Sequence, residues 1–173
     1  MLTHGILLGI MAKSIGIVIM NTIFITPKII SQKCRYALRA IFELASRGKA
    51  DVTKISEIAA AQAISPRFLE NILVELKQAG FVASRRGNDG GYMLARPASE
   101  LTVGEVIAFI QGQHRPNFMQ PAGETLRNGD YAFSKLWSRL NNVISDVYDN
   151  TTFADLVEEE SKAAKNYVPN YII

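Results

Sequence analysis

The chain has few of the side chains on which catalytic and metal sites depend. Its 173 residues include one cysteine, Cys34, and two histidines, His4 and His114. A single cysteine can form no internal disulfide and cannot hold a metal alone, so we expect Cys34 to be a small buried hydrophobe. No Ser/His/Asp, Cys/His or paired-carboxylate pattern stands out in the sequence. The composition therefore predicts no catalytic residues, no metal site and a protein that is not an enzyme.

The chain as a whole also has little net charge, yet its charged residues are unevenly distributed. The net formal charge is +3, which is too small to indicate a nucleic-acid partner. Residues 28–96 hold 12 Lys and Arg against 6 Asp and Glu, whereas residues 97–173 hold 6 against 10. A basic front half and an acidic back half favour DNA binding by the first and another task for the second. Such a division also arises by chance, so it only supports the motifs.

The basic half contains two predicted helices with a tight connection between them. Ile55 begins a short helix, and Ser65 and Pro66 are residue types that suit the cap and the first position of the second helix. Gly80 is expected to end the second helix, because glycine readily adopts the left-handed conformation found there. The predicted buried stripe of this helix is Phe68, Leu69, Ile72, Leu73 and Leu76. The pattern predicts a helix-turn-helix.

A basic β-hairpin, or wing, is expected directly after the second helix. Apolar residues at 81–82 and 92–94 predict two short strands, and the glycine-rich run 87–91 predicts the turn between them. Arg85 and Arg86 stand where the tip of this hairpin begins. A helix-turn-helix followed by a basic wing is the architecture of a DNA-reading module.

Three further helices are predicted. Residues 31–47 have the spacing of an amphipathic helix, and Thr102 with Glu105 forms a T-x-x-E capping box that opens a helix ending at Gly112. Residues 133–150 predict a long helix with a wide apolar stripe, formed by Phe133, Leu136, Trp137, Leu140, Val143, Ile144 and Val147. Pairing with the same helix of a second copy would bury this stripe, and folding back on its own domain is the alternative.

The N-terminal residues 1–27 are apolar but contain Lys13 near their middle. Our interpretation is that they derive from a start codon assigned too early, with Met20 or Met11 as the true start. A membrane tether and an ordered extra element are the alternatives. A charged side chain in the middle of a spanning segment costs about 2.5–3.5 kcal/mol, which argues against the tether. We therefore expect a cytoplasmic protein with no membrane association.

Three stretches resemble one bacterial family. KCRYALRAIFELA, ISEIAAAQAISPRFLENILVELKQAGFV and SRRGNDGGYMLARP are similar to the winged-helix regulators of the IscR/NsrR/CymR type, the Rrf-two family. The resemblance covers roughly residues 31–111 strongly and 133–158 weakly, and the "RGxxGGY" wing is its most specific part. It implies a dimeric winged-helix transcription factor. Many members are repressors, and several carry an iron–sulfur cluster while others sense metabolites or partner proteins.

The resemblance also implies which residues read DNA bases. It places Arg67, Glu70 and Asn71 at the base-reading face of the recognition helix, and Arg86 in the minor groove. Arg67 can fork onto guanine, Glu70 can accept from cytosine, and Asn71 can pair with adenine. Narrow A·T stretches of the minor groove attract guanidinium groups such as that of Arg86. An ion pair with Arg67 is the alternative for Glu70, and it does not exclude a base contact.

Phosphate contacts are expected from Lys33, Arg35, Ser65 and Arg85. Lys33 lies near a predicted helix start, where backbone amides also favour anions. For each arginine of the helix 31–47, a solvated face is an equally good interpretation. These four residues would hold the protein on the duplex without reading its sequence.

Residues 113–131 are predicted to be an effector-type loop. Cluster-binding members of the family carry three cysteines in this region, whereas this chain has none there, and Tyr131 stands near the place of the last. Iron–sulfur clusters need thiolate ligands, so we expect no cluster and no other cofactor. Phe118 and Met119 could line a site for a small molecule or a protein effector, although a loop packed on its own core is the alternative.

The sequence thus predicts a mainly α fold with a small β-hairpin wing. Its expected parts are an N-terminal extension (1–27), a winged helix-turn-helix domain (28–112), the loop (113–131), a dimerisation helix with its end (132–158) and a tail (159–173). The expected function is a transcriptional regulator, a repressor in our interpretation, that binds double-stranded DNA as a homodimer at a palindromic operator. The alternative is a protein-interaction module that controls, or is controlled by, a metabolic enzyme, with DNA binding secondary.

Overall fold

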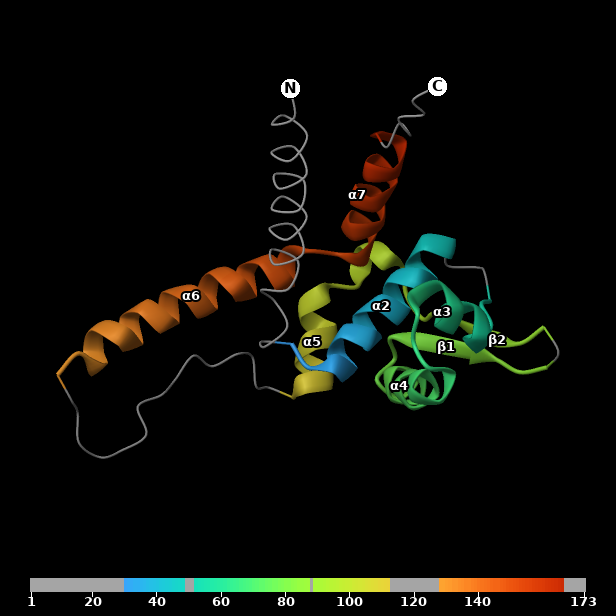
Figure 1. Ribbon diagram of the computed structural model, residues 1–173, viewed down its shortest axis with the longest axis horizontal. Helices are drawn as coiled ribbons and strands as arrows, with labels where there is room; N and C mark the ends of the chain where they lie inside the picture. Colours follow the sequence, from blue (N-terminus) through green and yellow to red (C-terminus); the bar gives the residue numbers. More distant parts are fainter. Residues whose placement is uncertain (1–29, 49–51, 88, 113–127, 167–173) are drawn as a thin grey trace, which may run out of the picture. The chain divides into compact units, whose positions relative to one another are not determined.

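The computed structural model describes residues 30–48, 52–87, 89–112 and 128–166. All described residues from 33 onward belong to one compact unit. The elements are α2 (Gln32–Arg47), α3 (Ile55–Gln62), α4 (Pro66–Gln78), β1 (Val82–Arg85), β2 (Gly91–Leu94), the 3-10 helix η1 (Ala98–Glu100), α5 (Val103–Gln111), α6 (Asp130–Asn150) and α7 (Phe153–Asn166) (Figure 1). The predicted class, mainly α with a small β-hairpin, is confirmed.

Two of the predicted parts lie wholly or largely outside the described residues. These are the N-terminal extension (1–27) and the effector-type loop (113–131), of which only the last few residues are described. Among the described residues, no helix combines the length and the apolar character that crossing a bilayer requires.

The core of the winged domain is built from α2, α3, α4 and α5. Its fully buried side chains include Ala37, Ile41, Ile58, Leu69, Leu73, Leu76, Leu101 and Val106. The predicted stripe on α4 is confirmed at its leucine and isoleucine positions, but it is wrong at Phe68, which is 43% exposed. Successive helical residues are rotated by about 100°, so Phe68 falls at the edge of the stripe. There its ring packs edge-on against that of Tyr36, with 5.6 Å between the centroids.

The ends of α4 follow the sequence except at the cap. Pro66 occupies the start of the helix as predicted, whereas the side chain of Ser65 makes no capping hydrogen bond. The Ser65 backbone carbonyl accepts the amides of the next turn instead. Gly80 has φ +76° and ends the helix as predicted. The amide of Phe81 then donates to the Leu76 carbonyl at 3.0 Å, which satisfies one of the last free carbonyls of α4.

The wing is a two-stranded antiparallel sheet that is anchored at its base. β1 and β2 pair so that Arg85 lies opposite Gly91. Thr53, which precedes α3, exchanges two backbone hydrogen bonds of 2.8 Å with Tyr92 of β2. A Cβ on Gly91 would collide with the Thr53 carbonyl, so glycine is needed for this close approach. The base of the wing is therefore fixed to the segment that leads into the helix-turn-helix.

A polar network that the sequence did not reveal joins α2 to α3. Glu43 is only 9% exposed, and its two carboxylate oxygens accept from Arg47 Nε at 2.7 Å and from Gln62 Nε2 at 2.8 Å. Arg47 also donates to Glu57 at 2.8 Å. The hydrogen bond with Glu43 raises the pKa of Arg47. Because the buried carboxylate is paired at both oxygens, its desolvation is compensated and the network holds α3 against α2.

Two capping boxes meet where α5 and α7 begin. The predicted box is confirmed, since the Thr102 amide donates to Glu105 at 2.9 Å and the Glu105 amide donates to the Thr102 hydroxyl at 3.3 Å. Thr152 and Asp155 form the same arrangement at the start of α7. Thr102 and Thr152 also pair as a short antiparallel bridge. The bridge ties the junction of α6 and α7 to the winged domain. α7 continues to Asn166, so the expected tail is helical in its first part.

The long helix α6 has its apolar side exposed. All of its residues are described and none is buried. Its large exposed apolar side chains are Tyr131, Phe133, Leu136, Leu140, Val143 and Val147. The side of α6 that faces α5 is mixed in character, and a small gap beside Gly104 is lined by Asn141, Ile144, Ser145, Tyr148 and Asp149. A Cβ on Gly104 would collide with the Asp149 side chain, so the two helices approach closely there.

Candidate nucleic-acid interface

The exposed face of α4 carries the residues predicted to read bases. Arg67, Glu70 and Asn71 are all exposed and lie opposite the buried stripe of the helix. No ion pair joins Arg67 to Glu70 within the described part of the chain. The alternative considered for Glu70, an intrahelical pair, is therefore not formed here. Both charged groups remain available to partners outside the chain.

Two arginines at the wing have different surroundings. Arg85 is the last residue of β1, and its Nη2 donates to the backbone carbonyl of Asp89 at 3.1 Å across the turn. Arg86 follows the strand and is exposed. Arg85 thus braces the turn, whereas Arg86 is presented at the start of the wing tip.

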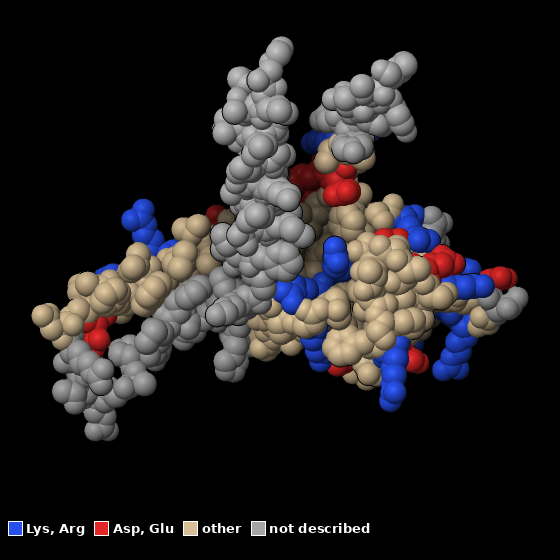
Figure 2. All heavy atoms as spheres, viewed as in Figure 1, with Lys and Arg blue, Asp and Glu red and all other residues tan. Residues whose placement is uncertain are grey.

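The helix α4 and the wing are joined by a direct side-chain contact. Lys77, in the last turn of α4, donates to the hydroxyl of Ser84 in β1 at 2.6 Å. This bond places the wing beside the end of α4. Figure 2 shows Lys and Arg side chains projecting around α4 and the wing. The structure therefore brings the α4 face and the wing arginines into one neighbourhood.

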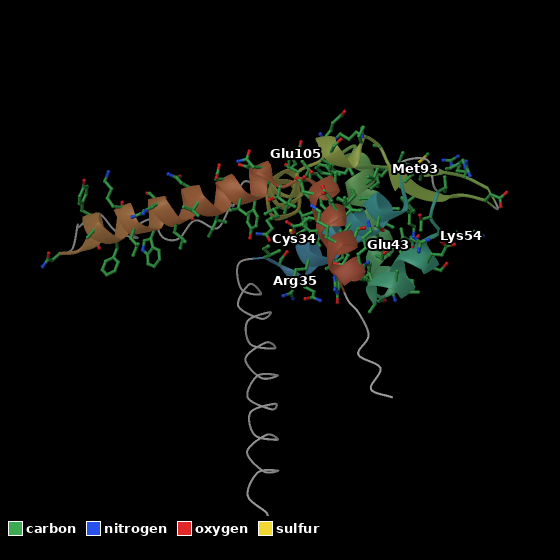
Figure 3. The ribbon with its side chains drawn as sticks, turned by 90° about the horizontal axis from the view of Figure 1, so that it is seen from above. Cys34, Arg35, Glu43, Lys54, Met93 and Glu105 are labelled. Atoms are coloured by element: carbon green, nitrogen blue, oxygen red, sulfur yellow. The ribbon has the colours of Figure 1, made fainter. Side chains whose placement is uncertain are left out.

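The remaining predicted phosphate contacts lie at the starts of α2 and α4. Ser65 is exposed immediately before α4. Lys33 Nζ lies 2.6 Å from Glu75 Oε2, so it links α2 to the second half of α4. In Figure 3, Arg35 lies near the start of α2, while Lys54 and Met93 lie on the side of the wing. Arg35 therefore lies on a different part of the surface from β2 of the wing, while Lys33 contacts α4.

Sequence reasoning missed two residues of the α4 face. Lys77 was not assigned a role, although a lysine in the last turn of a recognition helix lies where a following wing must pack. Val74 is 43% exposed and follows Asn71 by three residues, so it shares its face. The signal for Val74 was an apolar residue outside the spacing of the buried stripe.

Known proteins match both the sequence and this geometry. A family model described as Rrf2, an iron-dependent transcriptional regulator, matches residues 30–159. The chain belongs to the Rrf2 family. This Rrf2 protein is 34% identical over 127 residues to the HTH-type transcriptional regulator CymR of Bacillus subtilis, a match that covers 73% of this chain and 88% of CymR.

Solved structures of Rrf2 proteins agree with the fold. The structure of CymR, the global cysteine regulator of B. subtilis, matches with a TM-score of 0.65 and 32% identity over 75% of this chain and 96% of that one. IscR of T. potens matches with a TM-score of 0.64 and 26% identity over 83% and 94% of the two chains. The predicted family and the winged-helix fold are confirmed. The protein is a DNA-binding transcriptional regulator of the helix-turn-helix type.

The residues of this Rrf2 protein do not fit an iron–sulfur cluster. The chain has one cysteine, Cys34, which is buried in α2, and burial raises the pKa of its thiol to about 11. Such a thiol stays protonated near neutral pH, whereas a cluster ligand must be a thiolate. In the ranges that the structure describes, no three or more His, Cys, Asp and Glu side chains are grouped to hold a metal ion.

Proposed function

We propose that this Rrf2 protein is a cytoplasmic repressor that binds a palindromic operator as a homodimer, without an iron–sulfur cluster and without enzymatic activity. The observation that carries the proposal is the exposed set of Arg67, Glu70 and Asn71 on α4, with Arg86 on the adjoining wing. A recognition helix places such side chains in the major groove, while a wing arginine reaches the minor groove.

Each of these side chains is complementary to a chemical group of DNA. Arg67 donates a bidentate pair of hydrogen bonds to guanine, and Asn71 does the same for adenine with one donor and one acceptor. Glu70 accepts from the amino group of cytosine, and it repels phosphates when that cytosine is absent. The carboxylate therefore lowers non-specific affinity and raises selectivity. Arg86 inserts its guanidinium into a narrow minor groove, where the negative potential is enhanced.

Phosphate contacts would complete the footprint at its edges. Ser65 and Arg85 lie at the start of α4 and at the wing, and Lys33 and Arg35 lie at the start of α2. Lys33 would exchange its contact with Glu75 for a phosphate, a change of small cost because the pair is solvent-exposed. These contacts fix the position of the protein on the duplex and make its affinity depend on salt.

Homodimer formation is supported by the orientation of α6. A helix that completes its own domain turns its apolar stripe inward, whereas α6 leaves most of its stripe exposed and faces α5 with both polar and apolar residues. An exposed apolar patch along a whole helix is typical of an interaction surface. A second copy carries the identical stripe, so two-fold pairing of α6 with α6 would bury both stripes at once. A two-fold protein in turn calls for a two-fold operator.

Selection from genomic DNA tests the proposal. The purified protein is incubated with sheared genomic DNA at fixed salt, and the retained fragments are sequenced. We expect enrichment of one inverted repeat, and higher transcription of the neighbouring gene when the protein is removed from cells. The matched control is the Arg67→Ala/Asn71→Ala variant, which should retain DNA without enrichment because both positions are exposed and their loss leaves the core intact. If the wild-type protein enriches no sequence, the proposal is contradicted.

A further inference from the structure

Val74 is an apolar side chain in the middle of the polar face that α4 presents to solvent. It is 43% exposed, while the neighbouring Leu73 is fully buried. With about 100° of rotation per residue, Val74 lies within a narrow arc that also contains Arg67 and Asn71. This arc is centred opposite the buried stripe. Val74 thus lies on the side of the helix that faces away from the core.

Among the described residues, Val74 is not part of the buried core. It lies outside the buried stripe, so its side chain adds little to the core. Its β-branched side chain also makes it a weaker helix former than alanine, so local helix stability does not favour it at an exposed position. One turn farther on, Lys77 is bonded to Ser84 of the wing. Val74 therefore lies on the exposed face of α4, one turn before the helix is joined to the wing.

The base edges in the major groove offer one apolar group that such a side chain can contact. Arg67, Glu70 and Asn71 present hydrogen-bonding groups, whereas Val74 has none to offer. Base edges in the major groove are donors and acceptors, with one apolar exception, the 5-methyl group of thymine. We propose that Val74 is a specificity-determining residue that selects thymine through contact with this methyl group. The inference rests on the proposed function, because it assumes that α4 enters the major groove.

The position of the selected thymine follows from helix geometry. Residues three or four apart on a helix surface lie about 5–6 Å from each other. Base pairs are stacked about 3.4 Å apart. The thymine read by Val74 should therefore lie about one or two base pairs from the pair read by Asn71, toward the side on which the wing contacts DNA. Each half of a palindromic operator would contain one such thymine.

Replacing thymine by uracil tests the inference, since the exchange removes only the methyl group. Duplexes of the selected repeat are made with uracil at one thymine position at a time, changed in both half-sites. Affinities are measured by fluorescence anisotropy at fixed salt for the wild type and for Val74→Ala. At one position, uracil should weaken wild-type binding about 3- to 10-fold per half-site, as for a lost apolar contact. Val74→Ala should bind thymine DNA more weakly than the wild type does, by a similar factor. The variant should show no further loss of affinity on uracil DNA.

The comparison of two proteins on two DNAs is a double-mutant cycle. Its outcomes distinguish failure of the inference from failure of the proposed function. If the losses from Val74→Ala and from uracil multiply at every position, the two groups do not touch and the inference is overturned. If the wild type binds the selected repeat no better than random DNA, the proposed function itself fails. Phe68→Ala is the matched control, because Phe68 is an equally exposed apolar residue on another side of α4. Its loss should be independent of uracil at every position. Thermal unfolding followed by circular dichroism confirms that both variants fold.

Discussion

The winged domain and the long helix α6 bury their apolar side chains in opposite ways. In the winged domain, Leu69, Leu73 and Leu76 are all fully buried, and the polar residues of α4 face outward. In α6, no residue is buried, and Leu136 and Val143 are 52% and 57% exposed. The two helices have similar amphipathic sequences, so the pattern alone does not distinguish them. The difference lies in which side of each helix faces its neighbours.

This contrast indicates that one part of the chain is complete by itself and the other is not. The apolar surface of α4 is removed from water within a single chain, which stabilises the fold directly. In the proposed homodimer, the apolar surface of α6 gains the same stabilisation when a second copy covers it. Substitutions in the two helices should therefore affect different equilibria, namely folding for α4 and association for α6.

The largest expected effect is the loss of core packing in α4. Leu73→Ala should lower the free energy of unfolding by about 2–5 kcal/mol, because it leaves a cavity at a fully buried site. Urea unfolding at one fixed protein concentration measures the change. The adjacent Val74→Ala, at an exposed position, should change the same quantity by less than about 1 kcal/mol. Equal effects at the two positions would contradict the packing described for α4.

A charge on the apolar face of α6 should break association while leaving the winged domain folded. Leu136→Glu would place one carboxylate from each copy in the paired apolar surface, where its desolvation is uncompensated. We expect the dimer dissociation constant to rise at least about 100-fold, or about 2.7 kcal/mol, by analytical ultracentrifugation. Asn142→Glu introduces the same side chain at an exposed position on the other side of the helix and should leave the dimer intact. Unchanged association of Leu136→Glu would exclude this face as the interface.

Removal of the wing arginine should weaken specific binding more than non-specific binding. Arg86→Ala should lose about 1–3 kcal/mol on the selected repeat and much less on random DNA, as expected for a lost base contact. Arg85→Ala should lose a smaller amount of binding free energy, equal on both DNAs, because Arg85 is proposed to contact phosphate. Its side chain also braces the wing turn through the Asp89 carbonyl. Anisotropy titrations at one salt concentration make the comparison. Equal losses for Arg86→Ala on both DNAs would make this residue a phosphate ligand only.

The smallest expected effect concerns acid stability at the junction of the two regions. Partial burial tends to raise the pKa of Glu105, but the hydrogen bonds from Thr102 and Arg96 outweigh it and lower the pKa below its ordinary value. A lowered pKa means that the stabilisation is present above about pH 4.5 and is lost as the pH falls through the folded-state pKa. Glu105→Gln should therefore flatten the fall of melting temperature below pH 4.5.

The matched control for this effect is Glu100→Gln. It removes a carboxylate close in sequence to Glu105 without changing the capping box. Its melting temperature should follow the wild-type pH dependence. If the melting temperature of Glu105→Gln fell with pH as steeply as that of the wild type, the capping box would not contribute to acid stability.

The parts of this structure that the sequence predicted are those with local causes. The box of Thr102 and Glu105 fixes a helix start through residues three apart, and Gly80 fixes a helix end through its own conformational freedom. The apolar stripe of α6 was equally predictable, as a pattern of seven residues. The exposure of the stripe was not predictable, because the pattern shows which residues share a face and not what packs against that face.

The parts that the sequence did not predict depend on contacts between distant segments. The network of Glu43, Arg47 and Gln62 requires α2 and α3 to be placed side by side, and the requirement for glycine at Gly91 arises from the approach of Thr53. Phe68 was wrongly assigned to the core because the edge of a buried stripe depends on how wide the covering surface is. At the candidate interface, the residues proposed to read bases came from the family resemblance, while Val74 was recognised from its exposure in the structure.

The most direct test of the account is the mass of the complex between the protein and its selected inverted repeat, measured by multi-angle light scattering. Two chains should bind each duplex that carries the full repeat, and the free protein should have the same two-chain mass. Leu136→Glu should shift the free protein to a single chain. One chain per full repeat, with a monomeric free protein, would contradict the central claim that paired α6 helices position two winged domains on one operator.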